Sequence, residues 1–217
     1  MARQAMTEAQ VQARREQILD ATMAVFEADG LEAVSFRRVA AHLGCSYSAP
    51  YRYFASKDEL LTALRARAFR WMEQAMLEAL AGVTGFRARL AALSRAFIDA
   101  ALSHPQRYAL MFFELPDSDL AQRSLELVAA KRDSLDVCTQ VIAEGEAAGE
   151  VVLDCDPLTA SHLLWAGAHG IVSLQIAGQF VMGRSAEALV PTMIQALMRG
   201  IERDADSEAR PEREVGA

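Results

Sequence analysis

The chain has 217 residues, of which 52% are hydrophobic and 24% charged, and its formal net charge is −7. This composition suits a soluble globular chain with a buried core, and it excludes collagen-like, low-complexity and broadly disordered classes. The 41 alanines, against 12 glycines and 6 prolines, favour an all-α chain, because alanine has the highest helix propensity.

The charge is distributed unevenly along the chain. Residues 1–70 contain 10 basic and 8 acidic side chains, a net charge of +2, whereas residues 71–217 contain 12 and 21, a net charge of −9. The overall negative charge therefore does not exclude a nucleic-acid-binding face near the N-terminus.

The cysteines and the apolar stretches indicate the compartment. Cys45, Cys138 and Cys155 are far apart, so we expect reduced thiols in a cytoplasmic protein, with a redox-sensing cysteine as the alternative. The N-terminal 17 residues lack the apolar region of a secretory signal. The longest apolar stretch, 163–178, is too short to span a bilayer comfortably, and we expect no membrane partner.

The first helix is predicted over residues 7–28. Thr7 and Gln10 have the spacing of an N-terminal capping box, and Gly30 can adopt the left-handed conformation that follows a helix C-terminus. Arg15 lies on the polar face of this helix, opposite its apolar stripe.

Residues 35–54 are predicted to form two short helices separated by a glycine turn. The turn is expected at Gly44, and Ser46 can cap the second helix. Pro50 falls near the fourth residue of that helix and disfavours α geometry at Ala49, so we expect a tight or partly 3₁₀ first turn.

A long helix is predicted to begin at a second capping box, formed by Ser56 and Glu59, and to end near Leu80. Further helices are predicted over residues 86–103, 105–114, 118–148, 157–177 and 185–202. The fourth of these begins with Asp156 and Pro157, a preferred N-cap followed by proline in the first helical position. No run of residues alternates with the period of a strand.

The two short helices and their turn form a helix-turn-helix pattern, in which the second helix enters the major groove of DNA. The chain has four tyrosines, and three of them lie in a stretch of seven residues inside this second helix: Tyr47, Tyr51 and Tyr53. On a 3.6-residue period, four polar side chains turn outward: Tyr47, Ser48, Tyr51 and Arg52. These groups suit phosphates and base edges. The alternative is that the tyrosines form a half-buried packing cluster.

Three cations lie at helix N-termini, where the helix macrodipole disfavours positive charge. Arg37 and Arg38 fall in the first turn of the first short helix, and Lys57 begins the long helix. Their position suggests an anionic partner, with ordinary solvated side chains as the alternative. Lys57 would reach a phosphate with the help of helix N-terminal N–H groups.

These residues resemble the TetR family of bacterial transcriptional regulators over about 50 positions, from Arg15 to Leu61. Ten residues fall at the family's spacings: Phe26, Gly30, Val39, Ala40, Gly44, Ser46, Tyr51, Phe54, Lys57 and Leu60. The resemblance implies an Ω-shaped homodimer whose subunits have a three-helix DNA-binding head and a larger helical ligand-binding and dimerisation body. We place the head at residues 1–55, the body at 56–205 and a flexible acidic tail at 206–217.

The resemblance also implies roles for single residues. Tyr51, Tyr53 and Lys57 occupy the family's phosphate-contacting positions, and Tyr53 replaces the histidine most common there. Four residues occupy positions that often face bases: Arg37, Tyr47, Ser48 and Arg52. The full set of predicted DNA contacts is Arg37, Arg38, Ser46, Tyr47, Ser48, Tyr51, Arg52, Tyr53 and Lys57.

The second half of the chain carries a further resemblance. Residues 165–178, WAGAHGIVSLQIAG, look like the C-terminal domain subtype named for its Trp-His-Gly signature. By this resemblance, this helix and the last one pair with their symmetry mates in a four-helix dimer interface, and small side chains allow close approach. The predicted interface residues are Gly170, Ser173, Leu174, Ala177, Met193 and Leu197. The alternative is that these stripes belong to the core of one chain.

A site for an apolar small molecule is predicted in the body, because methionine and aromatic side chains adapt to varied hydrophobic ligands. Its predicted residues are Met72, Met76, Phe97, Met111, Phe112, Trp165 and His169. The alternative is that all of them are core residues. We expect no cofactor and no metal, since His169 lacks acidic or histidine neighbours.

The sequence contains no G-x-S-x-G, Walker or dinucleotide-binding motif and no H-E-x-x-H, so we do not expect an enzyme. We predict a sequence-specific DNA-binding regulator, a repressor that a small hydrophobic ligand releases from a palindromic operator. The alternatives are a helical sensor or scaffold without DNA binding, and a small helical enzyme.

Overall fold

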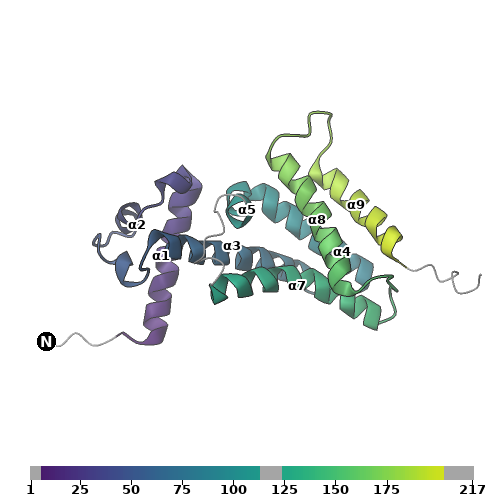
Figure 1. Ribbon diagram of the computed structural model, residues 1–217, viewed down its shortest axis with the longest axis horizontal. Helices are drawn as coiled ribbons and strands as arrows, with labels where there is room; N and C mark the ends of the chain where they lie inside the picture. Colours follow the sequence, from purple (N-terminus) through teal and green to yellow (C-terminus); the bar gives the residue numbers. More distant parts are fainter. Residues whose placement is uncertain (1–5, 113–123, 203–217) are drawn as a thin grey trace, which may run out of the picture. The chain divides into compact units, whose positions relative to one another are not determined.

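The computed structural model describes residues 6–112 and 124–202. These residues form helices joined by short connections, and no strand occurs among them (Figure 1). An isolated bridge pairs Leu153 with Glu202. The expected all-α fold is confirmed. In the part of the chain that the structure describes, no helix is both long and apolar enough to cross a membrane.

The helices follow the predicted order closely. They are α1 (Glu8–Asp29), η1 (Leu31–Ala33), α2 (Phe36–His42), η2 (Pro50–Arg52), α3 (Lys57–Leu80), α4 (Phe86–Ser103), α5 (Pro105–Phe112), α7 (Leu125–Ala147), α8 (Pro157–Ile176) and α9 (Ala186–Ile201), where η marks a 3₁₀ helix. Residues 113–114 and 118–123 of the predicted helices, and the expected tail at 206–217, lie outside the described residues.

Local capping explains why α1 and α3 begin where they do. The N–H of Gln10 donates to the Thr7 hydroxyl at 3.3 Å, and the N–H of Thr7 donates to the Gln10 side chain at 2.9 Å. At the start of α3, the N–H of Glu59 donates to the Ser56 hydroxyl at 3.1 Å. The first predicted box is therefore complete, whereas the second keeps only its Ser56 cap, because the Glu59 carboxylate accepts the N–H of Ala55 instead of that of Ser56. Both arrangements satisfy N–H groups that have no partner inside the helix.

The second of the two short helices, expected after the turn at Gly44, was predicted wrongly. Residues 46–54 form turns and the three-residue η2 instead of an α-helix. Ser46 caps nothing with its side chain, because η2 begins after Ala49 and has no side-chain cap. Pro50 is the first residue of η2, a position where its missing N–H sacrifices no helical hydrogen bond.

Ala49 also departs from the expectation. It has φ −63° and ψ −45°, the right-handed helical conformation that a following proline disfavours. The N–H of Arg52 donates to the Ala49 carbonyl at 3.2 Å, and this bond requires the helical conformation. Pro50 is buried, so burial of its ring and the 3₁₀ hydrogen bond outweigh the local preference.

The chain packs as two compact units. The described residues of the first fall within 1–73 and 103–134, and those of the second within 74–102 and 135–217. Phe54, with 1% of its surface exposed, belongs to the core of the first unit, and Phe86, with 2%, belongs to the core of the second. The units are defined by packing alone, so the functional head and body expected on either side of residue 55 stay a prediction.

Candidate nucleic-acid interface

The predicted DNA contacts lie on α2, on residues 46–54, which we call the recognition segment, and at the first residue of α3. Eight of the nine side chains are exposed, and only Tyr53 is half-buried. Exposure is what a contact with DNA requires, and it places these side chains on the surface of the first unit. Their contacts with DNA stay a prediction.

Tyr47 and Tyr51 form an exposed aromatic pair. Their hydroxyl oxygens lie 3.0 Å apart, so one hydroxyl donates to the other, and their ring centroids are 5.4 Å apart. Tyr51 also packs on Phe36 of α2, with ring centroids 4.1 Å apart. The side chains stay 58% and 45% exposed, which argues against the alternative of a half-buried cluster for this pair. The hydrogen bond that the Tyr51 hydroxyl shares with Tyr47 raises the pKa of Tyr51 above its ordinary value, so its phenol is protonated at neutral pH.

Tyr53 differs from the other two tyrosines. It is half-buried, and its hydroxyl donates to the sulfur of Met6 at 3.4 Å. A sulfur acceptor is weak, so a stronger acceptor such as a phosphate oxygen can replace it. The position that the resemblance assigns to phosphate contact is therefore occupied by a donor with only a weak partner.

The cations of this surface fall into two groups. Within residues 6–112 and 124–202, the side chains of Arg37, Arg52 and Lys57 make no hydrogen bond or ion pair. Arg38 instead pairs with Asp29 at the end of α1. Exposed ion pairs contribute little to stability, so this one leaves the arginine able to exchange its partner. The three cations without a partner are the stronger candidates for phosphate or base contacts.

The predicted ligand-binding residues are divided between the two units. Met72, Met111 and Phe112 belong to the first, and Met76, Phe97, Trp165 and His169 belong to the second. Four of them are at most 8% exposed: Met72, Met76, Phe97 and Met111. The rings of Trp165 and His169 lie 5.4 Å apart, and burial lowers the pKa of His169 below its ordinary value. None of the seven lines the two cavities described next.

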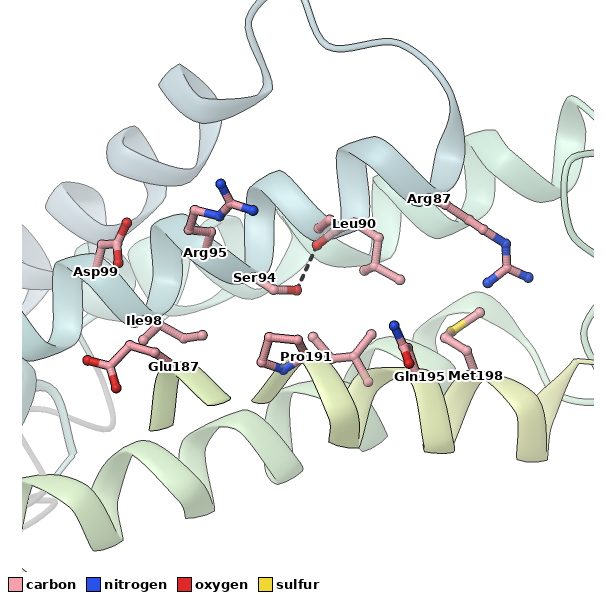
Figure 2. Close-up of a pocket in the computed structure, with 12 residues that line it drawn as sticks. Arg87, Leu90, Ser94, Arg95, Ile98, Asp99, Glu187, Pro191, Gln195 and Met198 are labelled. Carbon is pink, nitrogen blue, oxygen red and sulfur yellow. Dashed lines mark hydrogen bonds between the residues drawn. The ribbon is translucent and has the colours of Figure 1, made fainter. Parts of the chain in front are cut away.

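A groove of about 440 Å³ lies between α4 and α9 in the second unit (Figure 2). Its apolar residues include Leu90 and Ile98 of α4 and Met198 of α9, each at most 5% exposed. Charged side chains stand at its rim, among them Arg95, which Figure 2 shows turned away from α9. Its volume falls within the range of small-molecule sites. Sequence reasoning missed this groove, because nothing in the spacing of either helix indicates that their faces meet.

A second cavity, of about 340 Å³, lies in the first unit and is crossed by ion pairs. Arg107 pairs with Glu27 and lies over the ring of Trp71, 5.4 Å from its centroid. Arg67 pairs with Asp20. Because these charges already have partners, this cavity is a poorer candidate for a ligand than the groove between α4 and α9.

The predicted interface residues separate into two groups. Leu174 is 46% exposed, and an added Cβ at Gly170 would have nothing within 4 Å, so this side of α8 is open. Met193 of α9 instead packs inside the chain, where its sulfur would lie 2.6 Å from an added Cβ at Gly167. Of the remaining residues, Ala177 is exposed, and Ser173 and Leu197 are half-buried. The intrachain alternative therefore describes Met193, whereas the open side of α8 remains available to a second copy.

Comparison with known proteins identifies the family. Residues 18–64 match the family of bacterial regulatory proteins called tetR, and residues 90–197 match the tetracyclin repressor-like C-terminal domain. An HTH-type transcriptional regulator of Mycobacterium tuberculosis (strain ATCC 25618 / H37Rv) is 28% identical over 202 residues, covering 78% of this chain and 80% of its own. The HTH-type transcriptional repressor KstR of the same strain is 42% identical over 75 residues, covering 34% of each chain.

The fold has a close match among solved structures. A protein with unknown function from Rhodococcus sp. RHA1 is 28% identical and superposes with a TM-score of 0.74, covering 87% of this chain and 95% of its own. The two family matches include the helix-turn-helix residues and the Trp-His-Gly segment on which the resemblance rested. The chain therefore belongs to the TetR family of bacterial transcriptional regulators, which bind DNA through a helix-turn-helix.

Proposed function

We propose that this protein is a repressor that binds a palindromic operator as a homodimer and releases it when a small hydrophobic molecule binds. One observation carries the proposal for DNA: an exposed surface on which Arg37, Arg52 and Lys57 have no partner among the described residues, beside the Tyr47–Tyr51 pair. Its role is binding rather than catalysis, and it acts in the cytoplasm, where its operator lies.

The contacts divide by chemistry. Lys57 and the hydroxyls of Tyr51 and Tyr53 donate to phosphate oxygens, which fixes the register of the protein on the duplex. The side chains that contact base edges, where donors and acceptors differ between base pairs, are Arg37, Tyr47, Ser48 and Arg52. Of the two hydroxyls in the tyrosine pair, one hydrogen is used within the pair, so one remains for DNA.

The test uses the chain's two lysines. Lys57→Ala should weaken binding to every duplex by about the same factor, and it should make the dependence of log Kd on log salt shallower by about one counterion. Lys131→Ala removes the same charge from α7, outside the helix-turn-helix, and should leave the slope unchanged. The duplex is one that the wild type selects from random sequence. An unchanged slope in Lys57→Ala would remove Lys57 from the phosphate contacts.

A palindromic operator requires a protein with two-fold symmetry. We place the interface on α8 and α9, which lie side by side in the second unit. The open side of α8 supports this placement, because it exposes two apolar residues on one face of the helix that a second copy would cover: Leu163 and Leu174. Burying a carboxylate without a partner is costly, so Leu174→Glu should give a folded monomer that has lost operator affinity.

A matched control exists for this substitution. Leu77 of α3 is 44% exposed, against 46% for Leu174, and Leu77→Glu should leave the dimer intact. Sedimentation velocity measures the mass of both variants, and circular dichroism checks that both are folded. A dimeric Leu174→Glu variant would place the interface elsewhere.

The groove between α4 and α9 is the candidate effector site, with the buried residues predicted from the sequence as the alternative. Its apolar lining favours a hydrophobic or aromatic molecule over a sugar. Ala91 is exposed and lines the groove, so Ala91→Trp should fill it and weaken binding of the dye anilinonaphthalene sulfonate. Ala88 is exposed on the same helix and does not line the groove, so Ala88→Trp is the control. Equal dye affinity in both variants would exclude the groove.

Release from the operator requires coupling between the two ligands, and coupling in binding is reciprocal. Saturating operator DNA should therefore weaken dye binding by the same factor by which saturating dye weakens operator binding. Dye affinity that does not respond to the operator would contradict the proposed release.

A further inference from the structure

Arg15 of α1 makes three contacts that meet at the end of the recognition segment. Its Nη1 donates to the main-chain carbonyl of Tyr53. Its Cζ lies 4.1 Å from the centroid of the Phe54 ring, in the geometry of a cation–π contact. The same Nη1 lies 3.5 Å from Oε1 of Glu59 in the first turn of α3. A single guanidinium therefore contacts both the recognition segment and the helix that follows it.

The main-chain hydrogen bonds of the recognition segment are those of turns and a 3₁₀ helix, with no continuous α-helical series. The N–H of Ala49 donates to Ser46, that of Arg52 to Ala49, and those of Tyr53 and Phe54 to Pro50. A 3₁₀ helix of three residues is short, and its hydrogen-bond geometry is poorer than that of an α-helix. Tyr53 is the residue at the C-terminal end of η2, where a carbonyl lacks a partner inside the helix. A cation is the favoured group at that end, and Arg15 supplies it.

The contact with Glu59 extends this support to the start of α3. The second oxygen of Glu59, Oε2, accepts the N–H of Ala55 at 2.7 Å, and the N–H of Glu59 is capped by Ser56. Lys57 lies inside this capped turn. Arg15 therefore holds both the segment that carries Tyr51 and the turn that carries Lys57.

We propose that Arg15 is a positioning residue for DNA binding, which fixes the end of the recognition segment so that Tyr51 and Lys57 meet DNA at the correct spacing. This inference rests on the proposed function. Arg15 itself does not touch DNA: its side chain is 25% exposed, and its guanidinium is engaged by a carbonyl, a carboxylate and an aromatic ring.

The neighbouring arginine provides a matched control. Arg14 carries the same charge on the same helix, and its guanidinium donates to Gln17 at 2.7 Å on the exposed side of α1. Removing either arginine changes the net charge equally. A difference between Arg14→Ala and Arg15→Ala therefore reports the contacts of Arg15 with the recognition segment.

The experiment measures the Kd of the full chain for two duplexes over a series of salt concentrations. One duplex is selected from random sequence by the wild type, and the other is a scrambled duplex of the same length. We expect Arg15→Ala to bind the selected duplex about tenfold more weakly, in line with the loss of one hydrogen bond to a charged group. The Kd for the scrambled duplex and both salt slopes should stay unchanged, and Arg14→Ala should match the wild type.

Two results would overturn the inference. A shallower salt slope, with equal loss on both duplexes, would make Arg15 a direct phosphate contact. A lower melting temperature with an unchanged Kd per active molecule would make it a purely structural residue. If Arg15→Ala does not fold, Arg15→Lys keeps the charge and the stem but loses the fork of donors. We then expect about a threefold weaker Kd for the selected duplex, and a wild-type Kd would refute the proposal.

The outcomes also separate this inference from the proposed function. A wild type that selects no sequence contradicts both. A wild type that selects a sequence, together with an Arg15→Ala variant that binds it equally well, contradicts only the role of Arg15.

Discussion

Replacing Gly145 with alanine should destabilise the protein, although alanine is the better helix former. Gly145 lies within α7, and an added Cβ would lie 2.6 Å from Cδ2, 2.8 Å from Cγ and 3.0 Å from Cβ of Phe86. Carbon atoms in contact are normally about 3.5–4.0 Å apart. Phe86 cannot rotate away, because its Cβ is fixed to the backbone and its N–H donates to Glu150 at 2.5 Å.

The magnitude follows from two opposing effects. Exchanging glycine for alanine inside a helix gains about 1 kcal/mol of unfolding free energy. Overpacking a well-packed core costs about 1–3 kcal/mol, and the contact with the immobile Cβ of Phe86 favours the upper part of that range. The net loss is therefore about 1–2 kcal/mol. A chain of this size loses about 2–4 °C in Tm per kcal/mol, so we expect a decrease of several degrees.

Thermal unfolding followed by circular dichroism measures this change, at equal protein concentrations because the Tm of an oligomer depends on concentration. Gly200→Ala in α9 is the control, since its added Cβ would have nothing within 4 Å. Its Tm should equal or slightly exceed that of the wild type. A Gly145→Ala variant that melts at or above the wild-type temperature would refute the reasoning from the contact with Phe86.

Three further predictions concern single side chains. The side chains of Cys138 and Cys155 are both half-exposed, but burial of the thiol raises the pKa of Cys138 to about 12. Iodoacetamide at pH 8 should therefore modify Cys138 much more slowly than Cys155 in the native chain, as mass spectrometry would show. Burial lowers the pKa of His169 below its ordinary 6.5, so the unfolded chain takes up the proton at a higher pH than the folded chain does. The free energy of unfolding should therefore decrease below about pH 6.5 in the wild type, and decrease less in His169→Gln. Equal pH dependence of the two proteins in denaturant titrations would contradict this prediction. The effects of Tyr47→Phe and Tyr51→Phe on the free energy of DNA binding should differ from additivity by about 0.5 kcal/mol or more in a double-mutant cycle, because the two hydroxyls share a hydrogen bond. Strict additivity would mean that the two tyrosines bind DNA independently.

Features that depend on residues close in sequence were predictable. The capping box at Thr7 and the cap formed by Ser56 use partners three residues away, so the start of α1 and of α3 could be predicted from neighbouring residues. The cap formed by Asp156 is similar, since its carboxylate accepts the N–H of Thr159 at 3.0 Å. The outward position of Tyr47 also followed from local spacing, although an α-helix was assumed where the chain forms turns and a 3₁₀ helix.

Features that depend on distant residues were not predictable. Two contacts influence the conformation of the short recognition segment: the burial of Phe54, and the hydrogen bond that Arg15 donates to the carbonyl of Tyr53, 38 positions later in the chain. The periodicity of the sequence does not indicate such contacts. The groove needs Leu90 and Met198, which are about 100 positions apart, to face each other. Helical spacing identifies an apolar face, but it does not identify the face that packs against it.

The central claim is that the exposed surface of α2, the recognition segment and the first turn of α3 binds a palindromic operator. The most direct measurement is to sequence the DNA fragments that the purified full chain retains from the genome of its source organism. The account predicts that the retained fragments share an inverted repeat, and that a variant with Arg37→Ala, Arg52→Ala and Lys57→Ala does not enrich it. Retained fragments without a shared sequence, or the same repeat recovered by the triple variant, would contradict it.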